Sequence, residues 1–190
     1  MVHLMVAYQY NPASPSEFWV GNIAPDCIDD RKEKDKLHFR DTLDRNQALR
    51  KFERSIGKDD LFMEGMLLHL FVDWKWDEDL LQQYILNSNS DDWFNQYRNE
   101  IGILSARLYH DNLWSADVWK DILNCDIPKF NTTEISSEGV LTILQQVNRY
   151  HIKNPLAKPL FYSLELINKF TAKTAEDYKN WKNAILLPAN

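Results

Sequence analysis

Two polar residues interrupt the most apolar stretch of the sequence, residues 61–74. His69 and Asp73 are four residues apart, so in a helix both side chains project from one face, about 6 Å apart along the axis. A buried carboxylate is costly unless it is paired or coordinates a metal. An imidazole and a carboxylate one helical turn apart can reach one divalent ion together, although a hydrogen-bonded His–Asp pair in a core explains these two residues equally well.

Two further residues supply donors of the same kind. Asp26 ends the stretch Gly-Asn-Ile-Ala-Pro-Asp, and His38 follows a charged segment rich in lysine. Each is a weak indication by itself, because a loop aspartate is usually solvated and a single histidine is more often a surface residue than a ligand. Together with His69 and Asp73 they offer two imidazoles and two carboxylates, which suit a zinc-like divalent ion with ligand distances of about 2.0–2.2 Å.

The order of these residues resembles that of the zinc-dependent phospholipases C and the single-strand-specific zinc nucleases related to them. Small uncharacterised bacterial members of that superfamily are closer still. Those proteins carry a G-x-I-A-P-D stretch, a lysine-containing loop that ends in H-F, and a G-x-x-x-H-L-x-x-D helix. The three pieces occur here at residues 21–26, 34–39 and 65–73, so the resemblance covers roughly the first 75 residues.

The resemblance implies a ligand set and an activity. It implies that one zinc ion is bound by Asp26, His38, His69 and Asp73. It also implies that His3 and Asp73 share a second ion, unless His3 is simply a terminal residue. The implied reaction is hydrolysis of a phosphoester by a metal-bound water, with Asp73 or Asp26 orienting that water as well as binding the ion.

The chain departs from the family pattern beyond the third piece. No histidine follows before His110 and no His-x-x-x-Glu pair is present, so we expect one or two ions, most simply zinc, instead of three. His110 is a weaker candidate for a further ligand or a general acid. With Asp111 it also forms a doublet of the kind found in His-Asp phosphohydrolases, where His69 and either Asp121 or Asp126 would complete the set. That assignment stays a further alternative.

Cationic and aromatic residues lie close to the candidate ligands in the sequence. Arg40 and Lys36, together with Lys34, flank His38 and could clamp a substrate phosphate, since a guanidinium matches phosphate bidentately. A solvated charged loop is the alternative. Five tryptophans could line a pocket beside the ion or pack in the core: Trp74, Trp76, Trp93, Trp114 and Trp119. His151, late in a helical pattern, is expected to be a cation that suits the helix dipole, without a chemical role.

The elements that must position these side chains are expected to be helices. Ser14, Pro15 and Glu17 mark a helix start, with Ser14 as N-cap, and Ser115 is expected to cap another. Residues 29–36 are expected to form a charged loop. Residues 61–74 should form a central helix, because a helix that is apolar all round is buried. Apolar periodicity predicts further helices over about 41–55, 77–86, 91–110, 137–152 and 160–187, the last broken near 171–174.

Composition favours one all-α domain over residues 1–190. The hydrophobic fraction is 44%, and 5 glycines and 7 prolines suit long helices better than a turn-rich sandwich. The net charge of −6 disfavours broad nucleic-acid binding, which needs a basic surface. No apolar run approaches the ~20 residues of a bilayer span, the first residues lack a secretory pattern, and Cys27 and Cys125 form no disulfide framework. We therefore expect a cytoplasmic protein.

Two classes of function stay open at this point. The leading hypothesis is a metal-dependent hydrolase of a small-molecule or lipid phosphoester. The alternative is a non-catalytic helical protein in which an ion, or a bare His–Asp network, stabilises the fold. A catalytic ion keeps an open position in a cleft, whereas a structural ion is enclosed. The sequence leaves open the substrate, the metal and whether the chain forms a homo-oligomer.

Overall fold

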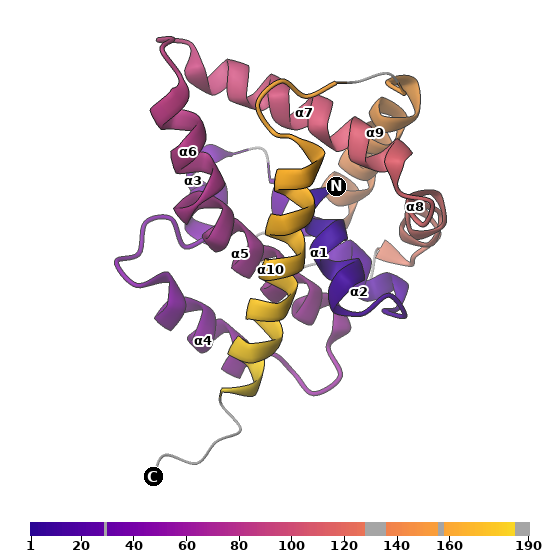
Figure 1. Ribbon diagram of the computed structural model, residues 1–190. Helices are drawn as coiled ribbons and strands as arrows, with labels where there is room; N and C mark the ends of the chain where they lie inside the picture. The colour runs from indigo at the N-terminus through magenta and orange to yellow at the C-terminus, as the bar shows by residue number, and fades with distance from the viewer. Residues whose placement is uncertain (29, 128–135, 156–157, 185–190) are drawn as a thin grey trace.

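The most apolar stretch of the chain forms helix α5, Leu61–Glu78, at the centre of the computed structural model (Figure 1). The helix begins after Asp60, whose carboxylate accepts a hydrogen bond from the backbone N–H of Met63, as an N-cap residue does. The predicted central helix is confirmed, and it continues one turn beyond residue 74. Its neighbours include α1 (Val2–Tyr10), α2 (Ser16–Gly21), α4 (Arg45–Ser55), α6 (Leu80–Asn87) and α10 (Leu164–Asn183).

The other helices lie around this group. They are the 3-10 helix η1 (Ala24–Cys27), α3 (Arg31–Leu37), α7 (Trp93–Asp111), α8 (Ser115–Leu123) and α9 (Ser137–Lys153). Helices α7, α8 and α9 pack against one another, and α10 runs across the front of the molecule beside α1 (Figure 1). The structure describes residues 1–28, 30–127, 136–155 and 158–184, and these contain no strand, so the all-α prediction is confirmed for them.

Helices α2 and α5 cross in close contact through two glycines. A Cβ atom at Gly21 would lie 2.0 Å from the backbone oxygen of Phe62, and one at Gly65 would lie 2.2 Å from the backbone oxygen of Phe18. Only glycine permits backbones to approach this closely, because any side chain would have to displace main chain. The crossing sets the end of α2 directly against the face of α5 that carries His69.

The charged segment before His38 is a helix, so the predicted loop is wrong. Helix α3 begins after Asp30, whose carboxylate accepts a hydrogen bond from the backbone N–H of Glu33. None of its residues is buried, which explains why apolar periodicity did not reveal it. Asp29, the first residue of the predicted loop, lies outside the described residues.

Three details of the predicted helix boundaries also differ. Helix α10 is unbroken at residues 171–174, where Thr171 and Thr174 are buried, and the predicted end at 185–187 lies outside the described residues. Pro15, not Ser14, occupies the N-cap position of α2. Ser115 is the first residue of α8 instead of its cap. Capping residues are only one of several ways to satisfy the first N–H groups of a helix, so a cap predicted from residue type can be displaced by a residue or two.

None of the helices in the described part of the chain combines the length and the apolar character that a bilayer span requires. Cys27 and Cys125 do not form a disulfide with each other. The fold is therefore held by packing around α5, without a covalent crosslink between these two residues.

Candidate metal centre

The residues predicted as ligands in the first part of the chain meet at one place beside α5. His69 and Asp73 belong to α5, Asp26 to η1 and His3 to α1, while His38 follows the last residue of α3. Two groups have ligand atoms that all lie within 4.8 Å of one another: His3, Asp26 and His69 in one, and His38, His69 and Asp73 in the other. These side chains could hold a metal ion at either of two neighbouring positions, and His69 belongs to both groups.

Backbone carbonyls determine which ring nitrogens of the two buried histidines face the centre. The Nδ1 N–H of His69 donates to the backbone oxygen of Asn22 at 2.9 Å, and that of His38 donates to the backbone oxygen of Lys34 at 2.7 Å. Because a carbonyl oxygen only accepts, each neutral ring carries its proton on Nδ1 and presents the lone pair of Nε2. Histidine ligands in metalloproteins are oriented by outer partners in this way.

The two Nε2 atoms face each other inside the protein. They are 3.1 Å apart, and both side chains are 0% exposed. Burial lowers the pKa of His38, and burial together with the neighbouring His3 lowers the pKa of His69 to about 3, so both rings are neutral at pH 7. Two nitrogens bound to one tetrahedral zinc ion would be about 3.3 Å apart. The pair therefore fits a shared cation better than a hydrogen bond, for which neither nitrogen has a proton.

Asp73 faces this pair and is hydrogen-bonded through both oxygens. Its Oδ1 accepts from Nε2 of His3 at 2.9 Å, and its Oδ2 accepts from Nη2 of Arg40 at 2.8 Å and lies 3.4 Å from Nε2 of His38. Burial alone would raise the pKa of Asp73, but the hydrogen bond from His3 and the neighbouring groups outweigh burial and hold the pKa well below its usual range. Asp73 is therefore ionised and able to bind a cation.

Asp26 forms the opposite side of the centre. Its Oδ1 lies 2.8 Å from Nζ of Lys34 and 3.9 Å from Nε2 of His38. Burial again opposes ionisation, but the Lys34 ammonium outweighs it and holds the pKa of Asp26 far below its usual range. The Lys34 ammonium also donates to the backbone oxygen of Asp26 at 3.2 Å, which fixes the position of η1 against α3.

The centre is closed on one side and open on the other. His38 and His69 have no exposed surface and the Asp73 side chain is 10% exposed, whereas the Asp26 side chain is 44% exposed. Two cationic side chains flank Asp26 and Asp73, and we call the surface formed by Asp26, Lys34 and Arg40 the open side. A ligand from solvent can approach the candidate ion from the open side.

Arg40 joins the centre to another carboxylate one turn further along α5. Its Nε donates to Oδ2 of Asp77 at 3.0 Å, and Nη1 of Arg45 donates to the same oxygen at 2.8 Å. Burial would lower the pKa of Arg40, but Asp73 and Asp77 outweigh burial and raise it above its usual value. The sequence reading missed Asp77 and Arg45. A signal for Asp77 was present, since it continues the four-residue spacing of His69 and Asp73.

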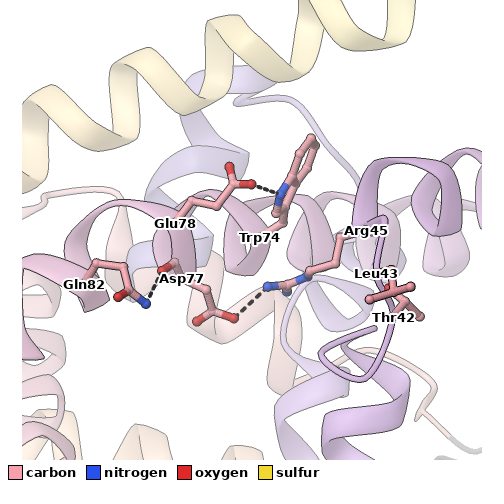
Figure 2. A pocket seen from close by; sticks show the side chains of 7 residues that line it. All are labelled: Thr42, Leu43, Arg45, Trp74, Asp77, Glu78 and Gln82. Carbon is pink, nitrogen blue, oxygen red and sulfur yellow. Dashed lines mark hydrogen bonds and ion pairs between the residues drawn. The ribbon is translucent and has the colours of Figure 1, made fainter.

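A surface pocket with a volume of about 380 Å³ begins at Asp77 (Figure 2). Its lining comes from the segment before α4, the first residue of α4, the end of α5 and the start of α6: Thr42, Leu43, Arg45, Trp74, Asp77, Glu78 and Gln82. Figure 2 shows Arg45 reaching Asp77, while Trp74 turns to Glu78 instead. Of the five tryptophans considered from the sequence, Trp74 thus lies in a pocket near the centre, whereas Trp76 and Trp119 are buried in the core.

A left-handed residue brings His38 and Arg40 to the same side. Phe39 has φ of 54°, and the backbone N–H groups of Phe39 and Arg40 bond back to the last turn of α3. This is the Schellman type of helix end, in which glycine usually takes the left-handed position. A bulky residue there costs roughly 1–2 kcal/mol. The Phe39 ring packs edge-on against Phe52 of α4, which holds the turn in place.

The weaker candidates from the sequence lie elsewhere. Lys36 is exposed in the last turn of α3, in contrast to Lys34 and Arg40 with their carboxylate partners. His110 hydrogen-bonds through Nε2 to the backbone oxygen of His151 at 2.8 Å, and Asp111 pairs with Arg107. Within the described residues, neither group that could hold an ion includes His110 or Asp111, so the geometry supports neither a ligand at His110 nor a His-Asp doublet.

Comparison of the chain with family models, with curated proteins and with solved structures found no match. The resemblance to the zinc-dependent phospholipases C and nucleases therefore rests on the three short sequence pieces alone. The centre consists of histidines and aspartates that could hold a metal ion: His38, His69 and Asp73 are buried, and Asp26 is open to solvent.

Proposed function

We propose that this protein is a metal-dependent hydrolase of a phosphoester, with an ion bound by Asp26, His38, His69 and Asp73. One observation carries the proposal. Two buried ring nitrogens, 3.1 Å apart, both present lone pairs because backbone carbonyls take the opposite N–H of each ring. Lone pairs in that arrangement need a cation, and the two carboxylates at their sides supply the negative charge that a divalent cation prefers.

Zinc suits this donor set best. Two imidazole nitrogens and two carboxylate oxygens make a tetrahedral site, although manganese, iron and nickel accept similar ligands. The second group, formed by His3, Asp26 and His69, is an alternative position for the ion, because His69 belongs to both groups and has one free lone pair. A bound divalent ion would polarise a phosphoryl oxygen and lower the pKa of a water.

The residues of the chain would contribute in distinct ways. Asp26 lies on the open side, where it can orient an attacking water. Asp73 would bind the ion from the buried side and share in orienting the water. Arg40 and Lys34 would hold the anionic group of the substrate, because both are cations directed at the centre from the open side. The carbonyls of Asn22 and Lys34 would keep the imidazole rings in place.

The open side favours a catalytic ion over a structural one. A structural ion is enclosed by its ligands, whereas a catalytic ion keeps a position for water or substrate. The 44% exposure of the Asp26 side chain leaves such a position accessible. A stabilising ion or a bare His–Asp network, the alternative considered from the sequence, would have no need of an exposed ligand flanked by two cations.

Elemental analysis of purified protein, combined with phosphoesterase assays, tests the proposal. We expect about one or two equivalents of a transition metal in wild type, and loss of both metal and activity in His69→Ala and Asp26→Ala. His110→Ala is the matched control, since this exposed histidine lies outside the centre and should keep both. Wild-type protein without stoichiometric metal, or metal retained in both variants, would contradict the metal centre. Bound metal without turnover of any phosphoester would favour the structural alternative.

A further inference from the structure

The charged groups of the centre are balanced one to one before any ion is added. Three carboxylates and three cations form direct pairs, each 2.8 Å long: Asp26 with Lys34, Asp73 with Arg40, and Asp77 with Arg45. Other charged side chains nearby are also paired, since Asp35 lies by Arg31 and Glu78 by Lys75. The side chains at and around the centre thus carry almost no net charge.

A divalent ion would upset this balance by two positive charges. Uncompensated charge is costly in a partly buried site, because the protein screens it poorly compared with water. Two of the three cations, Arg40 and Arg45, cannot give way by losing a proton, since an arginine stays charged in proteins. An anion taken up together with the ion would restore neutrality, and two negative charges match the excess.

Binding of the ion would also release two hydrogen-bond donors. Lys34 donates to an oxygen of Asp26 and Arg40 donates to an oxygen of Asp73, and these oxygens would coordinate the ion. Both side chains are partly exposed, so their freed N–H groups would remain on the open side. A phosphate monoester has three unesterified oxygens, one each for the ion, Lys34 and Arg40. A diester has only two.

We propose that the centre takes up a divalent ion and a dianionic oxyanion of the phosphate-monoester type together, and that each strengthens the binding of the other. The proposal rests on the proposed function for the position of the ion, and it adds the charge class of the substrate. The uncharged part of the ester would extend to the pocket beyond Asp77 (Figure 2), since Arg45, the cation in its lining, is already committed to Asp77.

Zinc titration of metal-free protein against a competing chelator tests the coupling. We expect inorganic phosphate to raise the apparent zinc affinity by roughly tenfold or more, and zinc to raise the phosphate affinity by the same factor, because linkage is reciprocal. Dimethyl phosphate, a monoanion with two unesterified oxygens, should change the zinc affinity by less than about threefold, below the usual range of such coupling.

Substitutions locate the effect. Lys34→Met and Arg40→Met should retain zinc binding and lose most of the effect of phosphate. Arg107→Met is the matched control, because this arginine of α7 pairs with Asp111 of the same helix, away from the open side, and it should leave the coupling unchanged.

The outcomes separate this proposal from the proposed function. Zinc affinity that phosphate does not change, or that dimethyl phosphate raises equally, overturns the proposal of a dianionic ligand. The metal centre would be unaffected by that result. Coupling that survives in both Lys34→Met and Arg40→Met overturns the assignment of the open side. Absence of zinc binding by wild-type protein overturns the metal centre and this proposal together.

Discussion

The molecule buries histidines in two regions, which differ in their surroundings. In the first region, His38 and His69 lie beside α5 with Asp26 and Asp73. In the second, His151 of α9 is equally buried, but its ring contacts are aromatic, with Tyr109, Trp119 and Tyr150 around it. Burial of a histidine is common to both, so burial by itself does not indicate a metal site.

The decisive difference is the direction of the lone pairs. The rings of His38 and His69 each donate a hydrogen bond from Nδ1 to a backbone carbonyl. Their Nε2 atoms face a shared space that carboxylates also line. His151 instead hydrogen-bonds through Nε2 to the hydroxyl of Ser105 at 2.8 Å, and its Nδ1 has no hydrogen-bond partner among the residues that the structure describes. A metal centre needs several donors converging on one point, and only the first region provides that.

The second region also corrects an expectation from the sequence. His151 was expected to be a cation near the end of a helix, but burial lowers its pKa to about 3, so the ring is neutral at pH 7. The stabilisation that a helix dipole offers to a charge, at most about 2 kcal/mol, does not offset the cost of burying that charge.

The largest expected effect comes from adding a side chain at the close contact between α2 and α5. Gly65→Ala would place a Cβ atom 2.2 Å from the backbone oxygen of Phe18 and push Asn22 away from His69. We expect a loss of about 3 kcal/mol or more in the free energy of unfolding, at the upper end for overpacking, measured by urea denaturation. Gly57→Ala is the control, because its Cβ would meet nothing closer than 3.9 Å. Equal stabilities of the two variants would show that the crossing is not tight.

Substitution of one histidine in each region tests the comparison directly. His69→Ala removes a converging lone pair, and we expect zinc affinity, measured by chelator competition, to fall by more than about 100-fold, beyond the effect of losing an outer partner. His151→Gln should change the zinc affinity by less than about threefold, since among the described residues no group of candidate ligands includes its ring. A comparable loss in both variants would mean that the two regions do not differ in the way described.

Acid should destabilise the metal-free protein through both regions. His69 and His151 have a folded-state pKa of about 3 against about 6.5 unfolded, so the unfolded chain binds more protons between these values. Stability is therefore complete above pH 6.5 and falls as the pH drops toward 3, by up to about 1.4 kcal/mol per pH unit for each histidine. Urea melts from pH 7 to 4 should show a shallower decline for His151→Gln. An unchanged slope would mean that His151 is not buried as a neutral ring.

The smallest effect is expected at the turn that carries His38. Phe39→Gly relieves a left-handed conformation worth roughly 1–2 kcal/mol but loses the contact with Phe52, so the free energy of unfolding should change by less than about 1 kcal/mol. Phe39→Val keeps a side chain that disfavours φ above zero and should be less stable than Phe39→Gly in the same urea melts. The opposite order would indicate that packing, not backbone conformation, dominates at this position.

Much of the fold was predictable because helices encode their own periodicity. Residues 61–74 are apolar all round, which can only be stable at the centre of a helical protein, and the structure places them there. Helix α3 escaped prediction because none of its residues is buried, so it has no apolar face to detect. The break predicted near residues 171–174 is absent, since Thr171 and Thr174 are buried inside an unbroken α10.

The sequence by itself determined what a single helix can determine: His69 and Asp73 on one face, one turn apart, within an apolar surface. The separation follows from 3.6 residues per turn and needs no other part of the chain. Residue types also identified Asp26 and His38 as donors, but not their distance from that helix.

Only the tertiary structure decided how the donors converge. The carbonyls that orient the rings belong to Asn22 and Lys34. The close contact of α2 with α5 at Gly21 and Gly65 places Asn22 beside His69, and α3 carries Lys34. The same packing selects Lys34 over Lys36 as a cation of the centre and takes His110 to the neighbourhood of α9. These outcomes depend on contacts between segments far apart in the chain, and spacing along a sequence carries no information about the distance between two helices.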